Sequence, residues 1–166
     1  GRYDRIVSIE MLEAVGHRYL PLYFQRIDDL LAPDGLAVLQ TIAIPDQRYE
    51  RYRRGTDFIR KHIFPGGHLP CLSAICSAIA RTPALHITPL DTFGPHYAAT
   101  LEAWDKRLLA NRQNARQLGF DETFLRKWHY YFCYCQAGFS ERLLDNLHLV
   151  LTRSGPEDGE TTNEHQ

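Results

Sequence analysis

The 166-residue sequence lacks most of the short motifs that identify a function at once. No G-x-G-x-x-G follows a strand-like run, and neither a Walker A motif nor an HExxH zinc pattern is present. A G-x-S-x-G nucleophile elbow is also missing. No apolar run approaches the roughly 18 residues that would span a membrane. These absences argue against a complete dinucleotide-binding domain, a P-loop nucleotidase, a zincin protease, an α/β-hydrolase and a transmembrane helix.

The sequence also lacks a marked excess of charge of either sign, since its formal net charge is -1. Such a chain has no global field that would attract nucleic acid or an anionic bilayer, so we expect no nucleic-acid partner. The hydrophobic fraction of 44% and the charged fraction of 23% are typical of a soluble globular domain. Arg48–Arg54 is the one basic stretch, and it could touch phosphate head groups or, more simply, form a solvated helix face.

Cysteine is limited to four residues without a metal-binding pattern, namely Cys71, Cys76, Cys133 and Cys135. None forms a CxxC pair, and no histidine pair lies beside them at zinc-finger spacing. Cys133 and Cys135 would point to different sides of a helix. We expect reduced thiols in the core and predict no metal site.

The first third of the sequence predicts one βαβ unit. Arg5–Met11 begins as a β-branched run typical of a buried strand, and Leu36–Ile44 is a stronger one. Between them, Arg18–Leu31 has apolar residues at helical spacing and ends at the turn residues 32–35. Strands joined by a helix are parallel, so a parallel pair is expected here.

The rest of the chain predicts further helices and strands and a polar end. Pro89 argues against an uninterrupted central ladder in the third strand. Residues 154–166 are polar and acidic, which predicts a disordered tail after a single domain at residues 1–153. In order, we expect a helix near Tyr52–His62, a helix at Ser73–Arg81, a strand at Leu85–Asp91, long helices at His96–Leu118 and Asp121–Leu144, and a closing strand at Asp145–Arg153.

Several short strings in a fixed order carry a family resemblance. The combination of IFPGG-x-LP with FG-x-x-Y-x-x-T-L-x-x-W is the specific part. On these strings the sequence resembles the cyclopropane-fatty-acyl-phospholipid synthase family of class I S-adenosylmethionine-dependent methyltransferases. The strings are YDRIVSIEMLEAVG (3–16), LLAPDG (30–35), LQTIAI (39–44), FIRKHIFPGGHLP (58–70), FGPHYAATLEAW (93–104), YYFCYCQAGF (130–139) and LVLTR (149–153).

The resemblance implies an α/β fold, namely the C-terminal half of a Rossmann-like methyltransferase sheet with about four strands and inserted helices. The chain would begin at the family's fourth strand, so the loop and carboxylate that hold S-adenosylmethionine would lie upstream. We therefore expect the isolated chain to be inactive and to bind no cofactor. An unpaired edge on its first strand would favour self-association. The alternative interpretation is an inactive half-domain that serves as a binding or interaction module.

The family's reaction is methyl transfer from S-adenosylmethionine to a cis double bond in a phospholipid acyl chain. Loss of a proton from the resulting carbocation then closes a cyclopropane, and a bound bicarbonate is the family's proposed base. By the resemblance, Glu13, Ile42 through its backbone, and Tyr97 match the bicarbonate-holding residues, while Glu10 is a less favoured candidate than Glu13. The implied partners are phospholipid acyl chains, which places the protein in the cytoplasm, peripheral to the membrane.

Gln40 departs from the family, because the cyclopropane-forming enzymes have histidine at this strand position. Glutamine can hydrogen-bond an anion but cannot carry charge or relay a proton. Gln40 therefore weakens the case for bicarbonate and for ring closure. Methylation without a ring is the alternative, giving a methylene or, with a separate reductant, a methyl-branched chain.

Aromatic residues offer candidates for the wall of an acyl channel, although helical spacing fits ordinary core packing at least as well. Four histidines have no acidic partner at motif spacing and are interpreted as surface or structural residues: His17, His62, His68 and His96. The candidate channel residues are Phe93, Trp104, Tyr130, Tyr131 and Phe139.

Overall fold

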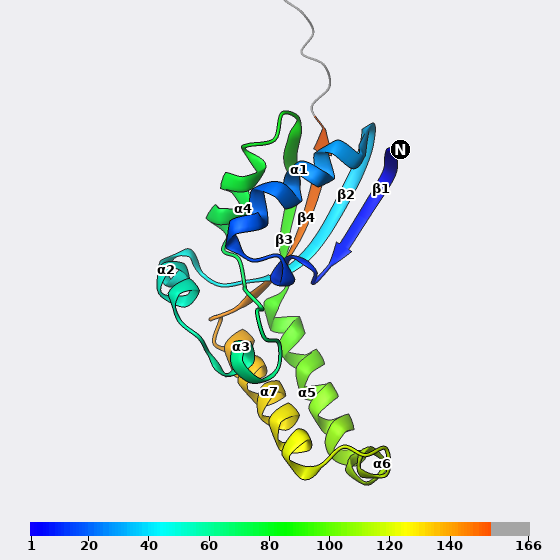
Figure 1. Cartoon of the computed structure of the whole chain (residues 1–166), viewed down its shortest axis with the longest axis vertical. Coiled ribbons are helices and arrows are strands. Elements are labelled where there is room, and N and C mark those ends of the chain that lie inside the picture. The colour runs from blue at the N-terminus through cyan, green and yellow to red at the C-terminus, as the bar shows by residue number, and fades with distance from the viewer. Residues whose placement is uncertain (154–166) are drawn as a thin grey trace, which may run out of the picture.

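The computed structural model describes residues 1–153, so the predicted disordered tail lies outside the described residues. Within that range a four-stranded mixed sheet forms the centre of the fold (Figure 1), with strand order β1-β2-β4-β3. β1 and β2 are parallel, and β4 runs antiparallel to both β2 and β3. The predicted α/β class and parallel first pair are confirmed. The strands are β1 (Tyr3–Ile9), β2 (Leu31–Ala43), β3 (Leu85–Thr92) and β4 (Asp145–Arg153).

Local sequence explains where several helices begin. Pro21 lies in the first turn of α1, where its missing N–H costs no hydrogen bond. Asp121 caps α7 by accepting from the Phe124 N–H at 2.7 Å. The helices are α1 (Leu20–Leu30), α2 (Asp46–Arg54), α3 (Phe58–His62), α4 (Leu72–Ile79), α5 (Gly94–Ala110), α6 (Arg112–Gln117) and α7 (Glu122–Ser140), with 3-10 turns η1 (Leu12–Ala14) and η2 (His17–Tyr19).

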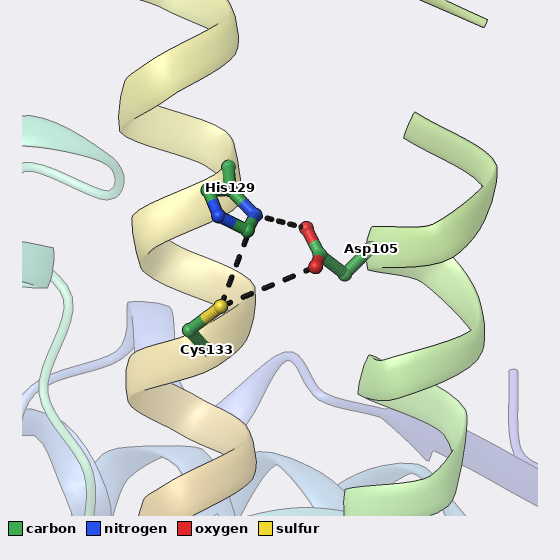
Figure 2. A group of neighbouring side chains, drawn as sticks. All are labelled: Asp105, His129 and Cys133. Atoms are coloured by element: carbon green, nitrogen blue, oxygen red, sulfur yellow. Dashed lines mark hydrogen bonds and ion pairs between the residues drawn. The ribbon is translucent and has the colours of Figure 1, made fainter. Parts of the chain in front are cut away.

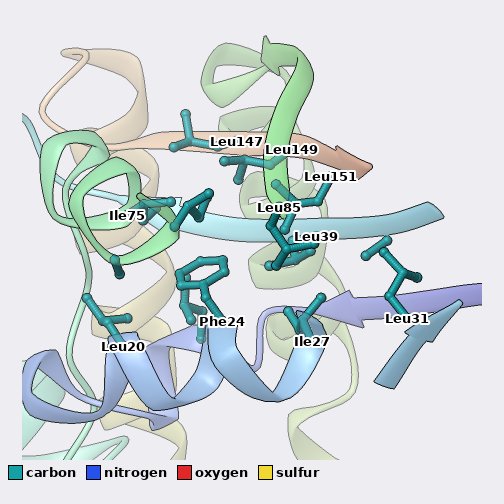
Figure 3. Close-up of a cluster of buried hydrophobic side chains, with 14 of the residues drawn as sticks. Leu20, Phe24, Ile27, Leu31, Leu39, Ile75, Leu85, Leu147, Leu149 and Leu151 are labelled. Carbon is teal, nitrogen blue, oxygen red and sulfur yellow. The ribbon is translucent and has the colours of Figure 1, made fainter. Parts of the chain in front are cut away.

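Two hydrophobic clusters divide the molecule. In the first, α1 and α4 pack on one face of the sheet, and Phe24 and Ile75 meet Leu39 and Leu149 there (Figure 3). The second cluster lies between α5 and α7, which form a helical hairpin projecting beyond one end of the sheet (Figure 1). The space between this hairpin and the strand ends is where the candidate site lies.

Two of the predicted helices are wrong because each is interrupted. The helix expected near Tyr52–His62 is split, since α2 ends at Arg54 and α3 starts anew behind the Asp57 cap. The helix expected at His96–Leu118 ends at Ala110, where the Asn111 side chain donates to the Arg107 carbonyl at 2.8 Å. Asparagine competes for backbone groups in this way, and hydrophobic spacing does not record it.

The two sheet irregularities lie at the predicted breakers. The turn expected at residues 32–35 is not a separate turn, because β2 is a strand from Leu31 to Ala43, but its register with β1 moves there from Tyr3–Leu31 directly to Arg5–Leu36. β3 is an edge strand whose ladder shifts between Ile87 and Leu90, around Pro89. The interrupted ladder predicted from this proline is confirmed.

β1 is not the buried strand that its sequence suggested. It pairs only with β2, and Val7 and Ile9 are 68% and 65% exposed. The prediction of core thiols is also wrong in part, because Cys76 and Cys133 are exposed while Cys71 and Cys135 are buried. Within residues 1–153, no helix combines the length and apolarity needed to cross a membrane.

Candidate active site

A cavity of about 740 Å³ lies between the strand ends and the α5–α7 hairpin. Its volume is within the usual range for small-molecule sites. Glu13, Ile42 and Tyr97, predicted from separate parts of the sequence, all line it, and so does Glu10. The C-terminal ends of β1 and β2 supply its polar floor, as expected for ligand sites in open α/β sheets. The structure thus brings most of the predicted catalytic residues into one space.

Glu13 is anchored by one carboxylate oxygen and leaves the other unpaired. Its Oε1 accepts the backbone N–H of Ile42 at 2.5 Å and the Thr41 hydroxyl at 3.0 Å. Its Oε2 is buried and accepts no hydrogen bond from any residue in the described range. Burial raises the pKa of Glu13 despite these donors, and the neighbouring Glu10 charge adds to the effect. A carboxylate with a raised pKa and an unpaired oxygen is well suited to accept a proton.

Glu10, the less favoured candidate, is a prominent part of the site. It directly follows β1 with a φ of 50°, a left-handed conformation that is uncommon for a residue with a side chain. Its Oε1 accepts from the Gln40 amide at 2.9 Å and from the Asn146 amide at 3.3 Å. The sequence could have indicated this role for Glu10, because the residue lies at the carboxyl end of a predicted strand, where open α/β sheets bind ligands. Asn146 gave no comparable signal in the sequence.

Gln40 hydrogen-bonds to Glu10 and is not among the described residues that line the cavity. While its amide nitrogen donates to Glu10, its Oε1 lies 3.0 Å from His148 Nε2. His148 in turn packs on Phe93, with ring centroids 4.3 Å apart. Phe93 is therefore also placed away from the lining, beside the outer end of this hydrogen-bonded chain.

Tyr97 stands in the first turn of α5 and faces the carboxylates. Burial, together with the Glu10 carboxylate that accepts from the phenol, raises the pKa of Tyr97. Its hydroxyl therefore remains a hydrogen-bond donor at neutral pH. The helix start is fixed because the Gly94 N–H donates to Asp145 Oδ1 at 2.8 Å. Tyr97 also packs on Phe139, with centroids 5.0 Å apart.

Aromatic side chains from α5 and α7 form the cavity wall. Trp104, Tyr131 and Phe139, which the sequence singled out, all line it. Phe64, from the loop after α3, packs edge-on against Tyr131 at 5.7 Å. Tyr130 does not line the cavity as described, and instead packs against the Phe58 ring at 4.6 Å. Such a wall can pack against a hydrocarbon chain, and the faces of its rings can attract a cation.

A polar network of buried Tyr49 and His68 with the exposed His17 lies beside Glu13. The His68 backbone N–H donates to the Glu13 carbonyl at 2.7 Å. The Tyr49 hydroxyl lies 2.9 Å from His68 Nε2 and 2.7 Å from His17 Nδ1. Burial lowers the pKa of His68 to about 4 and raises the pKa of Tyr49 to about 12, so both are neutral near pH 7. Sequence patterns did not reveal this network, whose members lie far apart along the chain.

Curated proteins are similar to this chain over nearly its whole length. The chain is 41% identical over 156 residues to the tuberculostearic acid methyltransferase UfaA1 of Mycobacterium tuberculosis, covering 94% of the chain and 36% of that protein. It is 33% identical over 163 residues to the cyclopropane-fatty-acyl-phospholipid synthase of Escherichia coli, covering 95% and 39%. The chain thus spans less than half the length of these curated relatives.

Solved structures and a family model agree with these relatives. The mycolic acid cyclopropane synthase CmaA1, solved in complex with SAH and CTAB, is 28% identical with a TM-score of 0.81, over 92% of this chain and 56% of that one. The described sheet and helices thus have the fold of one part of a methyltransferase. The family model for mycolic acid cyclopropane synthetase matches residues 1–149, and the chain belongs to this family.

Proposed function

We propose that this chain carries the acyl-chain side of an S-adenosylmethionine-dependent methyl transfer to a cis double bond, with a phospholipid acyl chain as the substrate. The observation that carries the proposal is the Glu13 carboxylate, which is fixed on Ile42 and keeps one buried, unpaired oxygen beside an aromatic cavity that also holds Tyr97. The names of the relatives support lipid methylation and cyclopropanation as the reaction class.

The cofactor itself would be held elsewhere. When bound, S-adenosylmethionine supplies an electrophilic methyl group. The sequence has no glycine-rich loop after a strand, and the cavity lining is dominated by aromatic and aliphatic side chains. We therefore assign no residue of this chain to cofactor binding, and we attribute to this chain the positioning of the alkene and the removal of the proton.

Each part of the site has a task in such a reaction. An alkene is a weak nucleophile, so the aromatic wall would hold it in a reactive position. Methyl addition leaves a carbocation on the acyl chain, which water would trap, and the apolar wall excludes water. The Glu10 and Glu13 carboxylates lie where they would stabilise this positive charge. Glu13 Oε2 then accepts the departing proton.

Two contacts favour Glu13 itself over a bound bicarbonate as the base. The Ile42 N–H that would hold the anion already donates to Glu13 Oε1. The Gln40 amide is engaged by Glu10 and His148. The residues present therefore do not fit a bicarbonate site, and we derive no step through that anion. Whether the proton leaves from the new methyl group, closing a ring, or after a hydride shift, leaving a methylene, decides the product.

The decisive experiment uses protein from the complete reading frame that contains residues 1–166. It is incubated with S-adenosylmethionine and vesicles of a cis-unsaturated phospholipid, and the acyl chains are analysed by mass spectrometry and NMR. We expect gain of one CH₂ unit per modified chain, which NMR assigns to a ring or a methylene. Glu13→Gln should lose at least about 100-fold in rate, whereas Glu141→Gln, an exposed matched control, should not.

Absence of any modified chain would overturn the proposed reaction. Binding of the same vesicles without methyl transfer would instead support the binding-module interpretation. Equal rates for Glu13→Gln and the wild-type protein would remove Glu13 from the role of base while leaving the family's reaction in place.

A further inference from the structure

A second group of chemically reactive side chains lies on the helical hairpin, outside the cavity lining described above. Asp105 on α5 faces His129 and Cys133 on α7, and the three side chains point toward one another (Figure 2). His129 Nδ1 is 2.7 Å from Asp105 Oδ1, and Cys133 Sγ is 3.8 Å from His129 Nδ1 and 4.0 Å from Asp105 Oδ2. The proposed methyl transfer uses none of them.

Helix geometry explains the convergence. His129 and Cys133 are four residues apart, so they lie one turn apart on the same face of α7. The packing of α5 against α7 brings Asp105 opposite that face. The Asp105 side chain is only 14% exposed, whereas Cys133 is exposed. A small ion could therefore enter from solvent at the cysteine and be held from below by the carboxylate.

A nucleophilic cysteine is a weaker interpretation of the same group. In a catalytic relay the acid contacts one ring nitrogen of histidine and the nucleophile contacts the other. Here Asp105 and Cys133 both approach Nδ1 of His129. The three ligand atoms therefore surround a common point, as the ligand atoms of a metal site do.

The donor types and spacings match a borderline-soft divalent ion. Thiolate, imidazole and carboxylate are the ligands of zinc, whereas magnesium and calcium prefer oxygen alone. With tetrahedral angles and ordinary bond lengths, a zinc-bound sulfur and nitrogen lie about 3.6 Å apart, and nitrogen and oxygen about 3.3 Å apart. The observed sulfur–nitrogen distance of 3.8 Å and nitrogen–oxygen distance of 2.7 Å are each within about 0.6 Å of these values. Small side-chain rotations are enough to make up the difference.

We propose that Asp105, His129 and Cys133 form a zinc-type metal site that cross-links α5 to α7, with solvent completing the coordination. α5 carries Tyr97 and α7 carries Tyr131, so the ion would brace two helices that form the cavity wall. The site's role is structural, and it is independent of the methyl-transfer proposal.

The test is metal binding by the full chain after removal of metals with a chelator. Zn²⁺ is titrated in competition with a chromogenic chelator, and Co²⁺ is used as a spectroscopic probe for a thiolate-to-metal charge-transfer band. We expect one ion per chain, a higher Tm with Zn²⁺, and no competition from excess Mg²⁺. Cys133→Ser should lose the band and at least about tenfold in affinity, since even outer-sphere changes cost that much.

The matched control is Cys76→Ser, which removes an exposed cysteine from α4 and should keep both the band and the affinity. Asp105→Asn provides a second variant that retains the thiol, and it should weaken Zn²⁺ binding while keeping the band. Binding that is equally tight in Cys133→Ser, or a band that is lost in Cys76→Ser instead, would overturn the assignment. So would the absence of any Co²⁺ band in the wild-type chain.

Discussion

The carboxylate of Glu13 accepts the backbone N–H of Ile42 at 2.5 Å, joining the turn after β1 to the end of β2. Together with the Thr41 hydroxyl, this contact fixes where the second carboxylate oxygen points. Because the two strands are parallel, their carboxyl ends meet at one edge of the sheet, which brings Glu13 within reach of Ile42.

Shortening this side chain should separate anchoring from catalysis. In Glu13→Asp the carboxylate is one methylene shorter, so it cannot both bond Ile42 and present an oxygen at the same place in the cavity. We expect the methyl-transfer rate to fall on the order of 100-fold, as misplacement by about 1 Å commonly does. Product formation under saturating substrate measures this, and Glu141→Asp serves as the control. A rate near wild type would show that the position of the carboxylate is not critical.

Gln40→Glu tests the link between Gln40 and Glu10. The substitution replaces an amide donor, 2.9 Å from Glu10 Oε1, with a second carboxylate. At pH 7 we expect a loss of about 1–3 kcal/mol in the free energy of unfolding. Two facing carboxylates raise each other's pKa, so part of this loss should be regained on acidification. Urea unfolding at pH 7 and pH 5 measures both. Gln47→Glu, on the exposed start of α2, should stay within about 0.5 kcal/mol.

Gly94→Ala should disturb the start of α5 through steric conflict. A Cβ at Gly94 would lie 2.6 Å from Asp145 Oδ1, the atom that accepts the Gly94 N–H. We expect a loss of about 1–3 kcal/mol in thermal or urea unfolding. At Gly55, where the nearest atom is 3.6 Å away, the same change should be tolerated. Equal effects at the two positions would contradict this account.

His68 should make stability depend on pH. Its pKa is lowered to about 4, so the neutral form's stabilisation is complete above the unfolded value near 6.5 and is lost as pH falls toward 4. The loss in unfolding free energy is at most about 3 kcal/mol. In His68→Gln this slope should disappear, whereas the exposed His96→Gln should keep it. Identical slopes in all three proteins between pH 7 and 4 would rule out His68 as the cause.

The exposed edge of β1 should drive self-association of the 166-residue chain. Val7 and Ile9 are solvent-exposed on a strand with one free side, which is a template for pairing. We expect light scattering to show a concentration-dependent rise in mass. Val7→Lys should suppress it, because a charged edge resists strand pairing. Leu118→Lys, at a position that is 78% exposed on the far hairpin, should not. A monomer at every concentration would contradict the prediction.

Local sequence patterns predicted much of the fold because they report local physics. The closing strand at Asp145–Arg153 and the start of α7 at Asp121 lie where the sequence predicted them. The helix break at Asn111 was missed, since one side-chain hydrogen bond outweighs hydrophobic spacing there. The predicted burial of β1 failed for a different reason: a β-branched run records a tendency to be buried, and neighbouring strands decide whether it is.

The sequence by itself determined the family resemblance, the element types and the chemical identity of Glu13 and Tyr97. Only the tertiary structure decided what surrounds them. The antiparallel register that sets Gln40 opposite His148 holds the glutamine beside Glu10, and no sequence spacing encodes that pairing. Asp105 likewise meets His129 only because α5 packs on α7. Contacts across elements depend on packing directions, which are fixed by the whole core and not by any one segment.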